Sequence, residues 1–402
     1  MDSHAIQDAV FSPDFRQQVE RELRGNILPF WVDHTVDQEN GGFYGALTND
    51  LHVLNDVPRS AVVCARILWT YSLAYRLYGE ARYLKMARHA YHYLTTCFWD
   101  ITYAGVYWTV DRDGYAVNDR KHVYAQAFAI YGLSEYYRAT RTEQSLELAQ
   151  QLFHLIEAHS HDATYDGNIE CCSRAWGTLA DMRLSDKEPD CRKSMNTLLH
   201  LMEAYTNLRR VWDDTNLAAR QRDLIEIFIQ HIVNLKTYHL NLFFDDAWNS
   251  LSTIVSYGHD IEASWLLVEA AEVAGDPQLL AQVRELAVKM AGVVWREGLD
   301  KNGSVMYETT RAGTDRTRHW WVQAEGVVGF LNAYQLSGRP EFAQAAVTCW
   351  NNIDRDFVDR IHGDWFKLVR PDGTPEWKHY KTGPWECPYH HSRMCVEVAA
   401  RI

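Results

Sequence analysis

The chain of 402 residues lacks a surplus of positive charge and any long hydrophobic run. Its 40 lysine and arginine residues are outnumbered by 53 aspartate and glutamate residues, which gives a net charge of −13. This balance argues against a nucleic-acid or anionic-membrane surface. No apolar stretch approaches the length of a membrane span, and the first thirty residues contain no apolar signal-peptide core. We therefore expect a cytoplasmic protein without nucleic-acid or membrane partners.

The chain also lacks paired cysteines and obvious linkers. None of its 8 cysteines forms a CxxC pair, and several lie in apolar helical stretches, so we expect reduced, buried thiols. The adjacent Cys171 and Cys172 are not expected to form a disulfide. The 10 prolines and 22 glycines are spread evenly, without a low-complexity tract. Residues 1–402 are therefore expected to form a single domain.

What the sequence does contain is a repeat of short, aromatic, strand-like segments. The steps between successive segments are 64, 63, 72, 63 and 60 residues. Such a regular period is the signature of a repeat architecture. The six segments are GGFYGAL from Gly41, GVYWTV from Gly105, NIECCSRAW from Asn168, LNLFFDDAW from Leu240, GSVMYETT from Gly303 and GDWFKLV from Gly363.

Two stretches with helical periodicity fill each interval between these segments. In the first interval, one helix is predicted over residues 59–79, with Gly79 as its C-cap, and its partner from Ala81 to about Trp99. The same pairing recurs from Lys121 and Glu143, from Ser194 and Asn216, from Tyr257 and Pro277, and from Arg318 and Pro340.

The C-terminal segment from Pro388 and the N-terminal helix from Pro13 would form the sixth pair. Twelve helices in six hairpins, with short β-hairpin inserts, predict an all-α fold, the (α/α)6 barrel. The alternative is an open α-solenoid, which has similar periodicity but lacks such regular strand-like inserts. Pairing of the two ends of the chain favours the closed barrel.

The first helix of each pair opens with polar and aromatic side chains, whereas the second resembles an ordinary amphipathic cover. In a closed barrel the first helices form the inner ring, and their starts would surround one pocket. Neighbours three or four residues apart also share a helix face. The opening residues are Arg59, Arg66, Lys121, His122, Tyr124, Asn196, His200, His259, Glu262, Arg318, His319, Trp320, Trp321, Tyr389 and His390.

Three histidines around one pocket, His200, His259 and His390, suit proton transfer near neutral pH. Each could instead be a hydrogen-bonded structural residue, and the tryptophans could belong only to the core. Glu262 and Glu325 could alternatively be the two carboxylates of an inverting glycosidase. The string HDIEASW does not match the HExxH zinc pattern, and no third ligand accompanies it, so no metal is expected.

Six strings resemble the N-acylglucosamine 2-epimerase superfamily, and most closely its cellobiose 2-epimerase branch. The resemblance runs in order from about residue 15 to residue 400, and GHDIEASWLL together with RHWWVQAE is highly specific. The strings are ARILWTYSLAYR, RKHVYAQAFAIYGLSE, SMNTLLHLMEAYTNLRRVW, SYGHDIEASWLL, RHWWVQAEGVVGFLNAYQ and CPYHHSRMCVE.

The resemblance implies a single (α/α)6-barrel catalytic domain that epimerises C2 of a reducing-end sugar without metal or nucleotide cofactor. It assigns His259 and His390 as the catalytic acid/base pair and His200 as an assisting group, and it places Arg66 by the sugar oxygens. Further sugar-binding positions are Tyr124, Asn196, Glu262, Trp321, Glu325 and Trp385.

The sequence departs from the branch at two places. Glu188 stands where the branch often has aspartate, in a loop over residues 176–193, and His391 and Ser392 replace part of the usual YHNGR ending. The expected partner is a disaccharide such as cellobiose or lactose, or free mannose or glucose for a mannose 2-epimerase or a mannose isomerase. A non-catalytic sugar-binding barrel is the remaining alternative, and the protein could be a monomer or a homodimer.

Carbonyl chemistry adds expectations about individual roles. The C2 proton of an aldose is acidic only in the open-chain form, and its removal gives an enediolate with charge on the C1 oxygen. We expect Arg66 and His200 to stabilise that charge. We expect His259 and His390 to flank C2, with Glu262 orienting the His259 imidazole.

Overall fold

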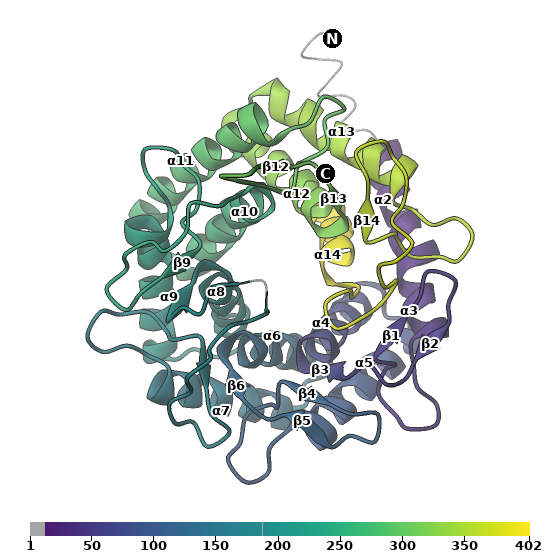
Figure 1. Ribbon diagram of the computed structural model, residues 1–402, viewed down its shortest axis with the longest axis vertical. Coiled ribbons are helices and arrows are strands. Elements are labelled where there is room, and N and C mark those ends of the chain that lie inside the picture. Colours follow the sequence, from purple (N-terminus) through teal and green to yellow (C-terminus); the bar gives the residue numbers. More distant parts are fainter. Residues whose placement is uncertain (1–12, 187) are drawn as a thin grey trace.

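The computed structural model describes residues 13–186 and 188–402, and its helices form a closed ring in two concentric layers (Figure 1). The inner helices contact one another in chain order, and the last of them, α14, returns to the first, α4. The inner helices are α4 (Ala61–Tyr78), α6 (Val123–Thr140), α8 (Met195–Arg209), α10 (Tyr257–Ala274), α12 (Trp320–Ser337) and α14 (Tyr389–Arg401). This closed ring confirms the predicted (α/α)6 barrel and excludes the open solenoid.

The outer layer covers the inner one with more amphipathic helices, as the sequence predicted. Its N-terminal member, α2 (Pro13–Glu22), continues through a π-helical turn into α3 (Leu28–His34) and packs against α14. The two ends of the described chain therefore form the sixth pair. The other outer helices are α5 (Ala81–Tyr93), α7 (Glu143–His159), α9 (Thr215–Ile227), α11 (Pro277–Val293) and α13 (Pro340–Asp356).

The helix ends agree closely with the sequence signals. Helix α4 stops at Gly79, which has a φ of +67° and donates its backbone N–H to Tyr75 O. Glycine adopts this left-handed conformation without the steric cost that a Cβ adds. A π-helical turn, Leu94–Phe98, extends the next outer helix almost to Trp99, where its end was predicted.

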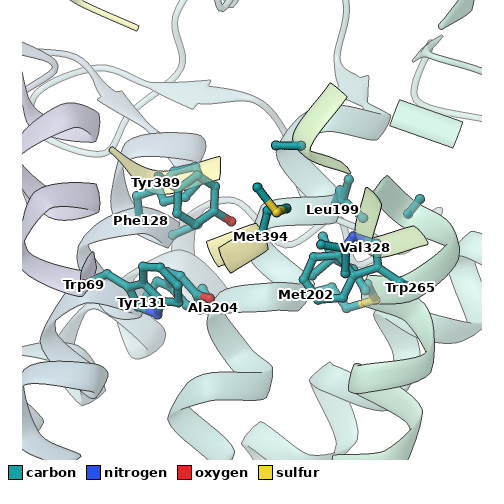
Figure 2. Close-up of a cluster of buried hydrophobic side chains, with 14 of the residues drawn as sticks. Trp69, Phe128, Tyr131, Leu199, Met202, Ala204, Trp265, Val328, Tyr389 and Met394 are labelled. Atoms are coloured by element: carbon teal, nitrogen blue, oxygen red, sulfur yellow. The ribbon is translucent and has the colours of Figure 1, made fainter. Parts of the chain in front are cut away.

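Apolar side chains fill the inner ring beyond the first turns of its helices (Figure 2). Trp69 and Tyr131 stack with ring centroids 5.1 Å apart, and Met202, Trp265 and Val328 are buried in the same cluster. Because this core occupies the middle of the inner helices, the polar residues at their N-terminal turns are confined to one end of the barrel.

Each predicted aromatic segment contains a short strand. Most of these strands pair with a two-residue strand that directly precedes an inner helix. They are β1 (Ala46–Leu47), β4 (Thr109–Val110), β7 (Cys171–Cys172), β9 (Phe243–Phe244), β11 (Glu308–Thr310) and β14 (Leu368–Val369). The strands that precede helices are β3 (Arg59–Ser60), β6 (Lys121–His122), β8 (Lys193–Ser194), β10 (Val255–Ser256) and β13 (Arg318–His319).

This pairing joins consecutive repeats at the end of the barrel where the inner helices begin. Strand β3 pairs with β4, and β4 continues into a hairpin with β5 (Ala116–Asn118). Strand β11 forms a similar hairpin with β12 (Gly313–Asp315), and β1 pairs with β2 (Val53–Leu54). Backbone hydrogen bonds between strands thus hold the starts of α4, α6, α8, α10 and α12.

Three cations that the sequence placed at the pocket do not line it, which corrects that part of the prediction. Their buried charged ends bind aspartates instead, of which Asp37 and Asp100 are buried and Asp356 is partly exposed. The pairs are Arg59 with Asp37 at 2.5 Å, Lys121 with Asp100 at 3.1 Å, and Arg318 with Asp356 at 2.6 Å. They belong to strands rather than to inner helices, so the helical assignment of these positions was wrong.

Within residues 13–186 and 188–402, no helix has the length and apolar character needed to span a lipid bilayer.

Candidate functional site

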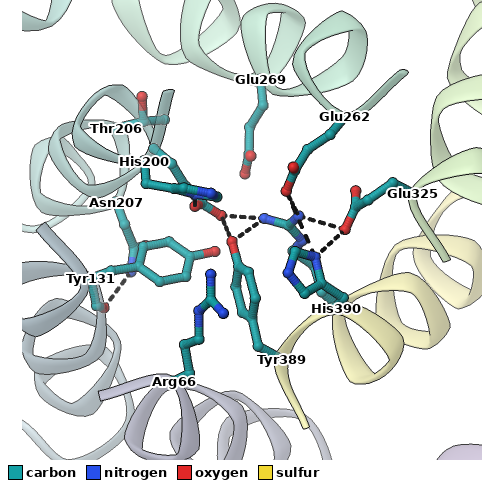
Figure 3. Close-up of polar contacts among 12 residues, drawn as sticks. Arg66, Tyr131, His200, Thr206, Asn207, Glu262, Glu269, Glu325, Tyr389 and His390 are labelled. Atoms are coloured by element: carbon teal, nitrogen blue, oxygen red, sulfur yellow. Dashed lines mark hydrogen bonds and ion pairs between the residues drawn. The ribbon is translucent and has the colours of Figure 1, made fainter. Parts of the chain in front are cut away.

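The candidate site lies at the N-terminal turns of the inner helices, where side chains from different helices converge (Figure 3). Arg66 comes from α4, His200 from α8, Glu262 from α10, Glu325 from α12 and His390 from α14. All five side chains are buried. By contrast, the other predicted site residues Asn196, His259, Trp321, Trp385 and Glu188 are partly exposed. The site therefore has a buried charged floor beneath a partly open rim.

Each of the three predicted histidines is held through the same ring atom. The hydrogen bonds join His200 Nδ1 to Glu203 Oε2 at 2.9 Å, His259 Nδ1 to Ser256 Oγ at 2.7 Å, and His390 Nδ1 to Glu325 Oε1 at 2.8 Å. At His200 and His390 the carboxylate partner accepts the Nδ1 proton and leaves the lone pair on Nε2, whereas the Ser256 hydroxyl can donate to His259 Nδ1 or accept from it. Nε2 is thus the nitrogen left to act on a ligand.

His259 and His390 contact the same indole ring. The Trp321 ring centroid lies 4.8 Å from that of His259 and 5.6 Å from that of His390. The fold thereby brings together two histidines that lie far apart in the sequence, as the barrel prediction required.

Glu262 does not orient His259, contrary to our expectation from their spacing. Its Oε1 accepts a hydrogen bond from Arg393 at 2.6 Å and lies 3.7 Å from His390 Nδ1. His259 sits in the first turn of α10 and bonds back to Ser256, whereas Glu262 lies one turn farther along and faces α14. Residues that share a helix face thus acquire different partners.

Arg393 is the centre of the buried floor. Its Nη2 donates to Glu262 Oε1 at 2.6 Å and to Glu325 Oε1 at 2.7 Å, while its Nη1 donates to Glu203 and to the Tyr389 hydroxyl. Tyr389 in turn donates to Glu203. One guanidinium thus links three inner helices to α14.

Arg66 and His200 lie beside each other, as expected. Arg66 Nη2 donates to the Tyr124 hydroxyl at 2.8 Å, and its guanidinium lies 4.1 Å from the Phe128 ring centroid. The His200 ring centroid is 5.1 Å from that of Tyr124 and 4.8 Å from that of Phe128. The two polar groups therefore share one aromatic wall.

Partly exposed aromatic and polar residues form the rim. The Trp385 ring centroid lies 6.0 Å from that of Tyr124 and 5.9 Å from that of Trp108. Asn196 Oδ1 has no hydrogen-bond partner among the described residues. Burial raises the pKa of Glu188 to about 7. Burial also raises the pKa of Tyr124, and nearby acidic groups, Glu188 among them, add to that shift.

Removal from water keeps the histidines neutral, because His200 and His390 are buried and even the partly exposed His259 has most of its ring enclosed by the pocket. This enclosure lowers the pKa of His259 to about 3, and the positive charge on a neighbouring protonated His200 would add to this shift. Burial together with Arg66 and Arg393 holds the pKa of His390 well below its usual value, and burial also lowers the pKa of His200. All three rings are therefore able to accept a proton at neutral pH.

The carboxyl groups beneath them differ in how readily they ionise. Burial opposes ionisation of Glu203, but Arg393 and His200 outweigh it and bring its pKa to about 2. Burial and the nearby Glu325 raise the pKa of Glu262 to about 8. Glu203 is thus ionised at neutral pH, whereas Glu262 gives up its proton less readily than an exposed glutamate.

The two glutamates do not fit the glycosidase alternative. Oxygens of Glu262 and Glu325 lie within 4.8 Å of each other and of His390, whereas an inverting glycosidase separates its carboxyl groups by about 6.5–9.5 Å. Glu262, Glu325 and His390 also resemble the donor set of a metal site, but Arg393 already supplies a cation between the two carboxyl groups.

A family model for N-acylglucosamine 2-epimerase (GlcNAc 2-epimerase) matches residues 42–393. The chain belongs to this family. It is 46% identical to a cellobiose 2-epimerase of Bacteroides fragilis over 385 residues, covering 95% of this chain and 98% of the relative. It is 40% identical to one from Ruminococcus albus, with 96% and 98% covered.

Solved structures agree with this membership of the N-acylglucosamine 2-epimerase family. The structure of a cellobiose 2-epimerase from Bacillus thermoamylovorans superposes with a TM-score of 0.92 at 40% identity, covering 97% of this chain and all of that one. A D-mannose isomerase structure shares the fold, with a TM-score of 0.85 at 19% identity, covering 98% of this chain and 100% of that chain.

Sequence reasoning missed Arg393, Glu203 and Ser256. Glu203 follows His200 by three residues, the same spacing that relates Glu262 to His259, and this spacing is a signal that could have identified it. Arg393 follows His390 by three residues, but its bonds to three other helices could not be read from spacing.

The departure at His391 lies away from the Arg393 floor. His391 Nε2 bonds Asp364 Oδ1 at 2.8 Å, and Lys367 Nζ bonds the other oxygen of Asp364 at 2.7 Å. Since His391 is fully buried among these groups, this substitution joins α14 to the loop after α13.

Proposed function

We propose that this protein is a sugar 2-epimerase. It interconverts the glucose and mannose configurations at C2 of the reducing-end residue in cellobiose, lactose and related β-1,4 disaccharides. The observation that carries this proposal is the pair His259 and His390 on one Trp321 ring, each with Nε2 left for the substrate. The cellobiose 2-epimerase names of relatives at 46% and 40% identity support the substrate class.

The reaction begins with opening of the sugar ring, because only the open-chain aldehyde makes the C2 proton acidic. A neutral imidazole removes that proton through Nε2, and the electron pair moves to the C1 oxygen to form the enediolate. Arg66 stands beside His200 and supplies positive charge for that oxygen, which stabilises the developing anion.

Inversion then requires a proton to reach C2 from the opposite face. His259 and His390 come from α10 and α14, so they can act from two sides of a bound substrate. The ring on one side is neutral and takes the proton, while the ring on the other side carries on Nε2 a proton gained from water as the substrate binds and delivers it to C2. Exchange with water then restores the two rings, and their roles exchange in the reverse direction. The negative charge of the enediolate favours the protonated form of the donor imidazole, offsetting the effect of burial.

The remaining positions bind and orient the sugar. Trp321 and Trp385 offer partly exposed aromatic faces, while Tyr124, Asn196 and Glu188 surround them with polar groups. Glu325 holds His390, and Glu262 lies in the same cluster. Proton transfer among these groups needs neither a metal nor an organic cofactor, and residues 1–402 act as one catalytic domain.

A product assay tests the proposal. The protein is incubated separately with cellobiose and with mannose, and the products are separated by chromatography. Glucosyl-mannose from cellobiose is the expected result. Free glucose from cellobiose would instead indicate hydrolysis, fructose from mannose without change of cellobiose would indicate a mannose isomerase, and no change would indicate a binding protein. A His390→Gln variant should form the glucosyl-mannose product about a hundredfold or more slowly.

A further inference from the structure

Two of the site histidines are held by equivalent carboxylates, and both carboxylates bind one guanidinium. Glu325 accepts from His390 Nδ1 at 2.8 Å and from Arg393 Nη2 at 2.7 Å. Glu203 accepts from His200 Nδ1 at 2.9 Å and from Arg393 Nη1. The order of contacts is therefore imidazole, carboxylate, guanidinium, carboxylate, imidazole.

We propose that Arg393 is a positioning residue for the epimerisation, which keeps Glu203 and Glu325 ionised and aimed so that His200 and His390 both carry their proton on Nδ1 and present a basic Nε2. This inference rests on the proposed function for its role in the reaction. Its structural part, the tautomer of two imidazoles, holds independently of any substrate.

The contacts of Arg393 require the planar guanidinium of an arginine, with its two separate terminal nitrogens. Arg393 donates through both terminal nitrogens, and its guanidinium lies 4.8 Å from the Trp265 ring centroid and 4.3 Å from that of Tyr389. Trp265 Nε1 also donates to Glu325 Oε2 at 2.9 Å, which fixes the far side of that carboxylate. A lysine ammonium is a compact point charge and cannot hold two separated carboxylates in this way.

Charge balance also points to Arg393. Glu203, Glu262 and Glu325 are almost completely buried around it. Without the guanidinium, these carboxyl groups would be buried together without a neutralising cation, and each would favour protonation. A protonated Glu325 or Glu203 no longer requires a proton on Nδ1, because it can itself donate to that nitrogen. The imidazole can then shift its proton to Nε2 and lose its basic atom there.

The experiment compares wild type, Arg393→Lys, Arg393→Met and Glu203→Gln, with Arg401→Met as the control. Arg401 lies in the same helix and bonds Asn332 and Glu397, away from the histidines. Histidine is labelled with ¹⁵N, and ring ¹H–¹⁵N correlation spectra of the substrate-free proteins report the tautomers. Spectra of His200→Gln and His390→Gln identify the two signals.

In wild type and Arg401→Met, both rings should carry the proton on Nδ1. Arg393→Lys and Arg393→Met should shift both rings toward the Nε2-protonated form, whereas Glu203→Gln should shift only His200. The kcat for cellobiose should fall about 10–100-fold in Arg393→Lys with KM little changed, because the effect is on the chemical step.

Unchanged tautomers together with a kcat near the wild-type value in a folded Arg393→Lys protein would overturn the proposal. If Arg393→Met does not fold, Arg393→Lys and Glu203→Gln decide it. If wild type fails to epimerise cellobiose, the proposed function fails while the tautomer measurement still decides what Arg393 does.

Discussion

A histidine can accept a proton only while its ring is neutral, and at this site burial favours the neutral ring. The effect is strongest at His259 and His390, the two residues assigned to the C2 proton. The sequence could place these histidines together, because it showed that they open inner helices. It could not show their hydrogen bonds, since these depend on how each side chain turns after the helices have packed. Glu262 is an example: its spacing from His259 predicted a hydrogen bond between the two, but its side chain accepts from Arg393 instead.

The first prediction concerns the acid limb of activity. The neutral fraction of each ring is lost only as pH falls through its pKa, which is about 3 for His259 and well below 6.5 for His390. The kcat/KM for cellobiose should therefore not fall as the pH is lowered through 6.5, and circular dichroism at each pH should establish that the protein is still folded. An acid limb centred at or above 6.5 would show that burial does not control these rings.

The second prediction concerns Ser256, the partner of His259 Nδ1. Ser256→Ala should leave that ring free to rotate, so kcat should fall by about tenfold with little change in KM. Ser145→Ala, in outer helix α7, is the matched control and should keep the wild-type kcat. A Ser256→Ala enzyme with unchanged kcat would mean that the Trp321 ring alone positions His259.

At the scale of elements, the helices were predictable and the strands only partly so. Helical periodicity and the Gly79 cap gave the inner and outer helices to within a few residues, and each aromatic segment does contain a strand. The strands that precede the inner helices are only two residues long, too short for alternation to reveal. Their cations were therefore assigned to the site, although Lys121 in fact binds Asp100.

The third prediction tests that buried pair. Asp100 accepts from Lys121 at 3.1 Å and from Arg174 at 2.9 Å, and both Lys121 and Asp100 are fully buried. Asp100→Ala would leave the lysine charge buried without a partner, so the free energy of unfolding in urea should fall by about 3–5 kcal/mol. The kcat of the folded enzyme should not change.

An exposed ion pair provides the comparison. Arg16 and Glu20 lie 3.2 Å apart on the surface of α2, and Glu20→Ala should change the free energy of unfolding by less than about 1 kcal/mol. If Asp100→Ala and Glu20→Ala lowered the free energy of unfolding equally, the buried pair of Lys121 and Asp100 would not be what holds strand β6 in place.

At the scale of the whole molecule, ring closure is what brings the site together. Six weak, periodic signals identified the barrel because they agreed in spacing, and closure then placed residues from α4 to α14 at one end. The identity of the groups beneath the histidines could not follow from closure, because Arg393 contacts three helices through a single side chain.

The fourth prediction follows from the closed ring. Since α14 contacts both α12 and α4, no subset of repeats can unfold without breaking helix contacts of the closed inner layer. Thermal unfolding should therefore show one cooperative transition, with loss of helical signal and loss of activity at the same temperature. Two separated transitions would contradict a single domain over residues 1–402.

The central claim is that His259 and His390 act on opposite faces of C2. The most direct test is exchange of the C2 hydrogen for deuterium in heavy water, measured by NMR. The variants His259→Gln and His390→Gln are each incubated with the glucose-configured disaccharide and, separately, with the mannose-configured one. Each variant should lose epimerisation by about a hundredfold or more, yet still exchange the C2 proton of one epimer, and the two variants should exchange opposite epimers. Near-wild-type epimerisation by either variant, or exchange of the same epimer by both, would contradict the two-base account.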